Sequence, residues 1–144
     1  DFQVAGLTSL DDVATNKCQI KFMSNLSCRT TGKFQDSQIL IIGDSHASHS
    51  LSGLHNIYPD KTISLINTQI FHKPERDNVI MENLIYVLNN LSDLKIVVIS
   101  NYWKEFRINE RSIKLLQQVS FKKTQFILIY GIPDFPFSSS QCFQ

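Results

Sequence analysis

The sequence lacks any long hydrophobic run and any excess of charge of one sign. No segment approaches the roughly 20 consecutive apolar residues that span a bilayer, so we expect no transmembrane helix. The formal net charge is only +1 and the Lys and Arg residues are scattered, which gives no electrostatic reason to expect a nucleic-acid partner. GxGxxG and Walker motifs are also missing, so a nucleotide-binding domain is not favoured.

The start of the chain lacks the features of a secretory leader, because DFQVAGLTSLDD mixes polar and apolar residues. We therefore expect a processed or excised piece of a longer protein. The composition is ordinary for a globular protein, with 42% hydrophobic and 19% charged residues. A length of 144 residues predicts one domain with room for a real core.

Cysteine is scarce, and its count of three is odd. Cys18 and Cys28 flank a short polar stretch, and a disulfide between them would close a loop worth about 2–3 kcal/mol. We expect this bond, in an oxidising compartment, with Cys142 paired to a residue beyond Gln144. Three free thiols in a cytosolic protein are the alternative. No CxxC or HxxxH pair stands near the cysteines, so we expect no metal site, and nothing calls for a cofactor.

Short apolar runs alternate with segments of helical periodicity after residue 37. We predict strands at 38–42, 62–66, 94–100 and 125–130, and helices at 45–57, 78–91 and 109–120. The strands are continuously apolar, which is typical of a parallel sheet covered by helices on both faces. This order predicts an α/β fold, a three-layer α/β/α sandwich with a parallel, flavodoxin-like sheet formed by residues 38–144. Residues 1–37 have little periodicity, and we expect an irregular segment packed on that core.

The stretch IIGDSHASHS places three polar residues, Asp44, Ser45 and His46, directly after the first predicted strand. Ligands of parallel α/β sheets bind outside the carboxyl ends of the strands. Ser45 also opens a helix, whose first N–H groups lack an intrahelical partner and can hold a developing oxyanion. Gly43 permits the tight turn from strand to helix. We therefore predict that Ser45 is an acyl-transfer nucleophile, with a helix-capping hydroxyl as the alternative.

The neighbours of Ser45 have separate expected roles. Asp44 is expected to shape the turn by accepting backbone hydrogen bonds at the edge of the substrate site. On a helix the His46 side chain points about 100° away from that of Ser45, so we predict a substrate-pocket residue rather than a general base. His49 is one turn further on, behind the hydroxyl. His72 follows the second predicted strand and is a candidate for substrate contact.

Three stretches of the chain resemble the SGNH hydrolase superfamily. ILIIGDSHASHSLSGL looks like its first motif, an apolar strand followed by Gly-Asp-Ser. The form Gly-Asp-Ser-His-Ala is most similar to the extracytoplasmic SGNH domains fused to membrane acyltransferase family 3 proteins, which O-acetylate bacterial surface polysaccharides. VVISNYWKEF and ILIYGIPDFPFSSSQCF resemble the third and fourth strands of that group, so the resemblance covers roughly residues 12–144.

The resemblance implies a serine O-acyltransferase or esterase that transfers or removes an acetyl group on a cell-surface carbohydrate through an acyl-Ser45 intermediate. It also implies a periplasmic domain tethered to an upstream integral-membrane acyltransferase. Asn101 would be an oxyanion donor, or else a strand-end Asn that bonds its own turn. Trp103 is expected to stack on a sugar ring, or else to close the end of the sheet.

Two parts of the family pattern have no match. The superfamily places a catalytic His in an Asp-x-x-His motif after a fifth strand, and this chain contains no such motif. Its glycine oxyanion donor after the second strand has no counterpart in SLINTQIFHKP. We expect the last strand and the catalytic His to lie beyond Gln144. The alternative is a non-catalytic carbohydrate-binding or interaction module on the same fold.

Overall fold

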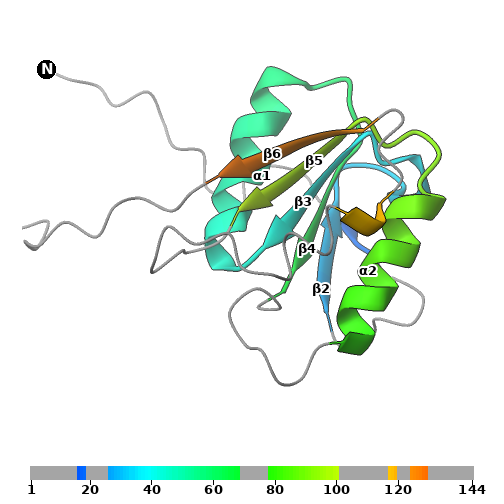
Figure 1. Cartoon of the computed structure of the whole chain (residues 1–144). Coiled ribbons are helices and arrows are strands. Elements are labelled where there is room, and N and C mark those ends of the chain that lie inside the picture. The colour runs from blue at the N-terminus through cyan, green and yellow to red at the C-terminus, as the bar shows by residue number, and fades with distance from the viewer. Residues whose placement is uncertain (1–15, 19–25, 69–77, 101–116, 120–123, 130–144) are drawn as a thin grey trace, which may run out of the picture.

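An α/β fold with a helix on each face of one sheet is seen in the computed structural model (Figure 1). The structure describes residues 16–18, 26–68, 78–100, 117–119 and 124–129. The described strands are β1 (Asn16–Lys17), β2 (Ser27–Thr30), β3 (Ile39–Gly43), β4 (Ile63–Asn67), β5 (Ile96–Ser100) and β6 (Gln125–Ile129). The helices are α1 (Ser45–Ile57) and α2 (Asn78–Asn90), and Phe34–Asp36 form a 3₁₀ turn.

The sheet is mixed, and β3 lies inside it. The strand order is β1-β2-β4-β3-β5-β6. β3 pairs in parallel with both β4 and β5, and β6 continues the parallel set beside β5. β2 runs antiparallel to β4, and β1 antiparallel to β2. The carboxyl ends of the four parallel strands therefore meet at one edge of the sheet.

Alternate residues of the buried strands form two separate cores. Ile41, Leu65 and Val98 pack with α1 on one face, in a cluster that includes Leu51. Their sequence neighbours point to the other face and pack with α2, in a cluster that includes Leu84. β3 is buried along its whole length. This explains why its sequence is continuously apolar instead of alternating.

The predicted positions of the four parallel strands and of the first two helices are confirmed to within two residues. Of the third predicted helix, at 109–120, only the last residues are described; Gln117 and Gln118 are helical and Val119 is buried. The four strands predicted after residue 37 pair in parallel as expected, but the sheet as a whole is mixed, because β2 pairs antiparallel with β4. Residues 1–37, expected to be irregular, contain β1, β2 and the 3₁₀ turn.

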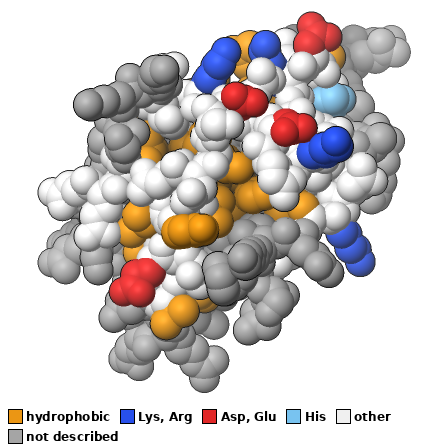
Figure 2. Space-filling view, turned by 90° about the vertical axis from the view of Figure 1, so that its right-hand side faces the viewer, with side chains coloured by type: hydrophobic (Ala, Val, Ile, Leu, Met, Phe, Trp, Pro, Cys, Tyr) orange, Lys and Arg blue, Asp and Glu red, His pale blue; other side chains and the backbone are white. Residues whose placement is uncertain are grey.

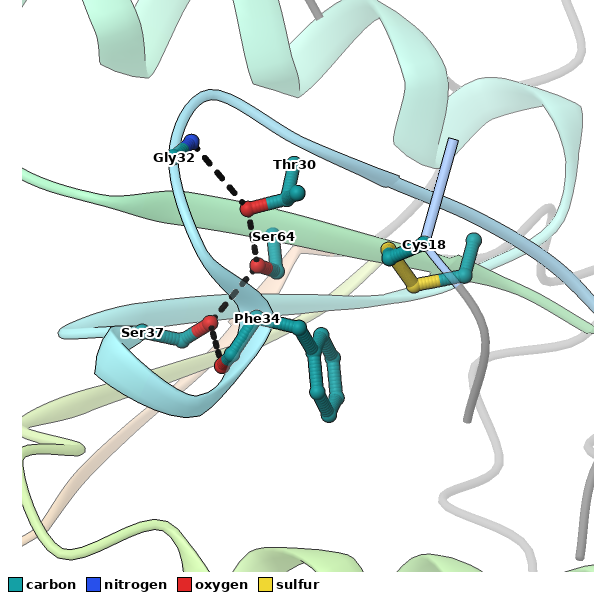
Figure 3. The surroundings of a disulfide bond; sticks show 7 residues. Cys18, Thr30, Gly32, Phe34, Ser37 and Ser64 are labelled. Carbon is teal, nitrogen blue, oxygen red and sulfur yellow. Dashed lines mark hydrogen bonds between the residues drawn. A yellow bond between two sulfur atoms is a disulfide. The ribbon is translucent and has the colours of Figure 1, made fainter. Parts of the chain in front are cut away.

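Hydroxyl groups hold the antiparallel edge onto the parallel part of the sheet (Figure 3). The side-chain oxygens of Thr30 and Ser64 are 2.8 Å apart, and those of Ser64 and Ser37 are 2.6 Å apart. Ser37 donates to the Phe34 carbonyl oxygen at 2.5 Å, and the Gly32 N–H donates to the Thr30 hydroxyl at 3.3 Å. These buried polar groups satisfy one another, which is why a polar strand such as SCRT is stable beside an apolar one.

A disulfide between Cys18 and Cys28 closes the same edge, as predicted (Figure 3). The two Cα atoms are 5.0 Å apart, within the range of about 4.4–6.8 Å that a disulfide requires. Cys28 is buried against the α2-side core, and the Cys18 N–H donates to the Cys28 carbonyl oxygen at 3.0 Å. The bond therefore ties β1 and the residue after it to the body of the domain.

The face of the molecule that carries α2 shows acidic and basic side chains interspersed, with apolar groups between them (Figure 2). No patch of a single charge stands out among the described residues in this view. Within the described ranges, neither helix has the length and apolar character needed to cross a membrane.

Candidate active site at the carboxyl end of β3

Gly43 brings three backbone segments together where β3 ends. A Cβ atom at this position would lie 1.7 Å from the Ser100 carbonyl oxygen of β5 and 2.8 Å from the Ala47 Cβ of α1. No side chain fits there, so α1 can pack directly on the strand end. We expected a glycine at position 43 because glycine can adopt the backbone angles of a tight turn. The φ angle of Gly43 lies outside the left-handed region, so that freedom is not used. The glycine is required instead because the three backbone segments approach so closely.

Ser45 is the first residue of α1 and is exposed to solvent. It therefore occupies the position expected from the sequence, at the carboxyl edge of parallel strands and at a helix start. The Ala47 N–H donates to the Asp44 carbonyl oxygen at 3.1 Å. The N–H groups of Ser45 and His46 precede that bond and have no acceptor within the helix. Two backbone donors and the positive end of the helix dipole thus lie beside the Ser45 hydroxyl.

Asp44 is buried, with 8% of its surface exposed, in contrast to the exposed serine that follows it. Its side chain is therefore directed away from solvent at the junction of β3 and α1. This placement fits the predicted part in shaping the turn.

Polar residues that the sequence analysis did not select lie on both sides of Gly43. The β-sheet register places Asn67, the last residue of β4, and Ser100, the last residue of β5, opposite Gly43. Ser100 is buried and Asn67 is half-buried. Thr68 follows Asn67, and its N–H donates to the Gly43 carbonyl oxygen at 2.6 Å. Each is a polar residue at the end of an apolar run, a signal that the sequence already contained.

The histidines of α1 differ in their distance from Ser45. His55 is ten residues further along the helix, a rise of about 15 Å, so it cannot reach the hydroxyl. His49 is exposed and one turn from Ser45. The side chain of His46, by contrast, lies outside the described residues, although its backbone is helical.

Several predicted site residues fall in segments outside the structural description. These are His72, Asn101, Trp103 and the unpaired Cys142 of the sequence analysis. Asn101 directly follows Ser100 in the chain, so the strand that leads to it ends at the same edge as β3. Among the described residues, no group of three or more His, Cys, Asp or Glu side chains is arranged to hold a metal ion.

Comparison with known proteins gives no match to this chain among protein-family models, curated proteins or solved structures.

Proposed function

We propose that the chain is an SGNH-type serine O-acyltransferase or esterase domain that acts on a cell-surface carbohydrate through an acyl-Ser45 intermediate. The observation that carries the proposal is the position of Ser45. It is an exposed hydroxyl at the first residue of α1, directly after an internal strand of a parallel set. Backbone N–H groups that have no acceptor within the helix, beside a solvent-accessible serine, are the two features that acyl transfer needs in one place.

The strand order supports the finer part of this proposal. The parallel strands lie in the order β4-β3-β5-β6, so the first of them in the chain sits between the second and the third. Ligands of such sheets bind where successive connections leave in opposite directions, next to the first strand. A three-layer, flavodoxin-like SGNH fold accounts for this order, for helices on both faces and for a site at Ser45.

In the proposed reaction the Ser45 hydroxyl oxygen attacks the carbonyl carbon of an acetyl ester while a general base takes its proton. A tetrahedral oxyanion forms and is held by the Ser45 N–H, with Asn101 as a further donor. The C–O bond to the leaving alcohol then breaks, and that alcohol receives the proton. A sugar hydroxyl or water attacks acetyl-Ser45 in the second step, which releases the serine.

The remaining parts of the proposal concern the surroundings of the enzyme. Trp103 stacks on the sugar, His46 and His72 line its site, and Asp44 shapes the turn at the edge of that site. The Cys18–Cys28 disulfide supports an oxidising, extracytoplasmic location, since such bonds persist outside the reducing cytosol. The domain is tethered to an integral-membrane acyltransferase, and its base is a histidine from a segment beyond Gln144.

The test compares the 144-residue chain with the protein extended along its natural reading frame, each with and without Ser45→Ala. We expect the extended protein to hydrolyse p-nitrophenyl acetate at least about 100-fold faster than the short chain, because a serine without its base loses roughly 10⁴–10⁶ in turnover. Ser45→Ala should abolish that gain. Ser48→Ala is the matched control, because Ser48 is a half-buried serine one turn along the same helix.

Fluorophosphonate labelling separates the enzyme from a binding module. An activated Ser45 in the extended protein should be labelled covalently, and Ser45→Ala should remove the label while Ser48→Ala retains it. An extended protein that neither turns over nor labels, yet binds acetylated polysaccharide, would establish the non-catalytic module instead. Full activity of the short chain that is lost in His49→Ala would place the base on α1.

A further inference from the structure

Asn67 lies at the edge of the sheet beside Ser45, and its amide side chain has no role in the acyl transfer proposed for Ser45. Asn67 ends β4 and is in register with Gly43, which precedes Ser45 by two residues. Its side chain is on the α1 face, because Leu65 and Ile63, two and four residues earlier in the strand, pack with α1. The first turn of α1 covers the same end of this face, as the short Gly43–Ala47 approach shows.

The backbone at the end of β4 cannot supply an oxyanion donor. The Thr68 N–H is already bound to the Gly43 carbonyl oxygen at 2.6 Å. The backbone of Asn67 faces β2, where it pairs with Ser27 in the antiparallel ladder. A donor on this side of Ser45 therefore has to come from a side chain.

Asn67 has the chemistry and the accessibility for that part. A carboxamide offers two N–H donors and no charge, so it can stabilise an oxyanion without binding it too firmly in the ground state. The residue is half-buried, whereas Thr68 and Ser100 beside it are buried. It is thus the polar residue at this end of β4 that remains partly accessible to solvent.

We infer that the Asn67 carboxamide donates a hydrogen bond to the oxyanion formed at Ser45, opposite the backbone N–H of Ser45. This inference rests on the proposed function, since it requires a tetrahedral intermediate on that serine. It assigns a catalytic part to the end of the second parallel strand. Beside the proposed Asn101 donor, the oxyanion would then have one donor from the helix start and one from β4.

The test is carried out on the extended protein with p-nitrophenyl acetate. We expect Asn67→Ala to lower kcat about 10²–10³-fold with KM changed less than about threefold, because the lost bond forms only in the transition state. Asn67→Asp has nearly the same shape and no N–H donor, so it should be at least as slow as Asn67→Ala. The affinity for a methylboronic acid, which forms a tetrahedral adduct with serine, should fall in parallel with kcat. Ser48→Ala is again the control and should retain both values.

The outcomes distinguish a failure of this inference from a failure of the proposed function. If Ser45→Ala abolishes turnover but Asn67→Ala or Asn67→Asp retains kcat, Asn67 is not a donor. A rise in KM with kcat unchanged would show substrate binding only and would also overturn the inference. If Asn67→Ala lowers the melting temperature, the uncharged Asn67→Leu decides, because leucine fills the space without an N–H donor. A packing role would let Asn67→Leu keep its kcat, and that result would overturn the inference. An extended protein without turnover or Ser45 labelling refutes both proposals together.

Discussion

Replacing Gly43 with alanine should damage the fold more than any other glycine substitution in the described chain. The new methyl group would lie 1.7 Å from the Ser100 carbonyl oxygen and 2.8 Å from the Ala47 Cβ. Relief of the first contact requires β3 and β5 to separate by more than about 1 Å, in a core packed as densely as a crystal. Overpacking costs typically 1–3 kcal/mol, and here the closest neighbour is a backbone atom that cannot rotate away. We expect a loss of about 3 kcal/mol or more in the free energy of unfolding.

Two other glycines provide matched controls, and their substitution by alanine should change the free energy of unfolding differently from Gly43→Ala. Gly53 is exposed in α1, and a Cβ there meets nothing within 4 Å. Gly53→Ala should therefore stabilise the protein by about 0.5–1 kcal/mol through helix propensity. At Gly32 the nearest atom is the Thr62 Oγ1 at 2.8 Å, a side-chain atom that can rotate. Gly32→Ala should cost clearly less than Gly43→Ala.

The free energies of unfolding of all three variants are measured by urea titration, with far-ultraviolet circular dichroism as the signal. With a slope of about 2 kcal/mol per molar urea, Gly43→Ala should lower the midpoint by about 1.5 M, and Gly53→Ala should raise it slightly. The proposed esterase activity of the extended protein should also fall with Gly43→Ala, because the start of α1 would move away from the strand end. If Gly43→Ala lies within about 0.5 kcal/mol of the natural protein, the close approach of β3, β5 and α1 is not real, and the site geometry built on it is wrong.

The antiparallel edge gives two further predictions. Reduction of the Cys18–Cys28 disulfide, with a sequence separation of 10, should lower the free energy of unfolding by about 2–3 kcal/mol through loop entropy, and urea midpoints with and without dithiothreitol should show it. A shift below about 0.5 kcal/mol would mean that β1 is not held by the bond. Ser64→Ala should cost about 1–3 kcal/mol, because it leaves the buried hydroxyls of Thr30 and Ser37 without their shared partner. A neutral Ser64→Ala in the same titration would contradict the hydroxyl network.

The parallel part of the fold could be predicted from the sequence because its signals are local. Runs such as ILII and IVVI are too short for buried helices, and the polar residues after them fix the strand ends. The stripe of Ile80, Leu84 and Leu88 likewise predicts α2, which is found at Asn78–Asn90. The position of Ser45 followed from the same logic, since one buried strand and one helix start determine it.

The antiparallel edge could not be predicted, because its stability comes from long-range polar contacts. In SCRT, Cys28 can be buried because it forms a disulfide with Cys18. Thr30 can be buried because its hydroxyl accepts a hydrogen bond from the Ser64 hydroxyl, 34 residues away in the chain. Neither contact leaves a periodic pattern. Asn67 was missed for a related reason. A polar residue after an apolar run marks the end of β4, but the position of Asn67 opposite Gly43 depends on the register of β4 against β3, which that local signal does not encode.

The internal position of β3 also has a consequence for the speed of folding. Each parallel pairing joins strands that are separated by a long crossover, so the loop must close before the contacts form. Proteins rich in such distant contacts fold slowly for their size. The residues beside Ser45 come from both neighbours of β3 and can meet only after β4 and β5 have docked. A chain emerging from the ribosome therefore carries Ser45 long before the residues at the ends of β4 and β5 lie beside it, and the proposed site is assembled only as the sheet nears completion.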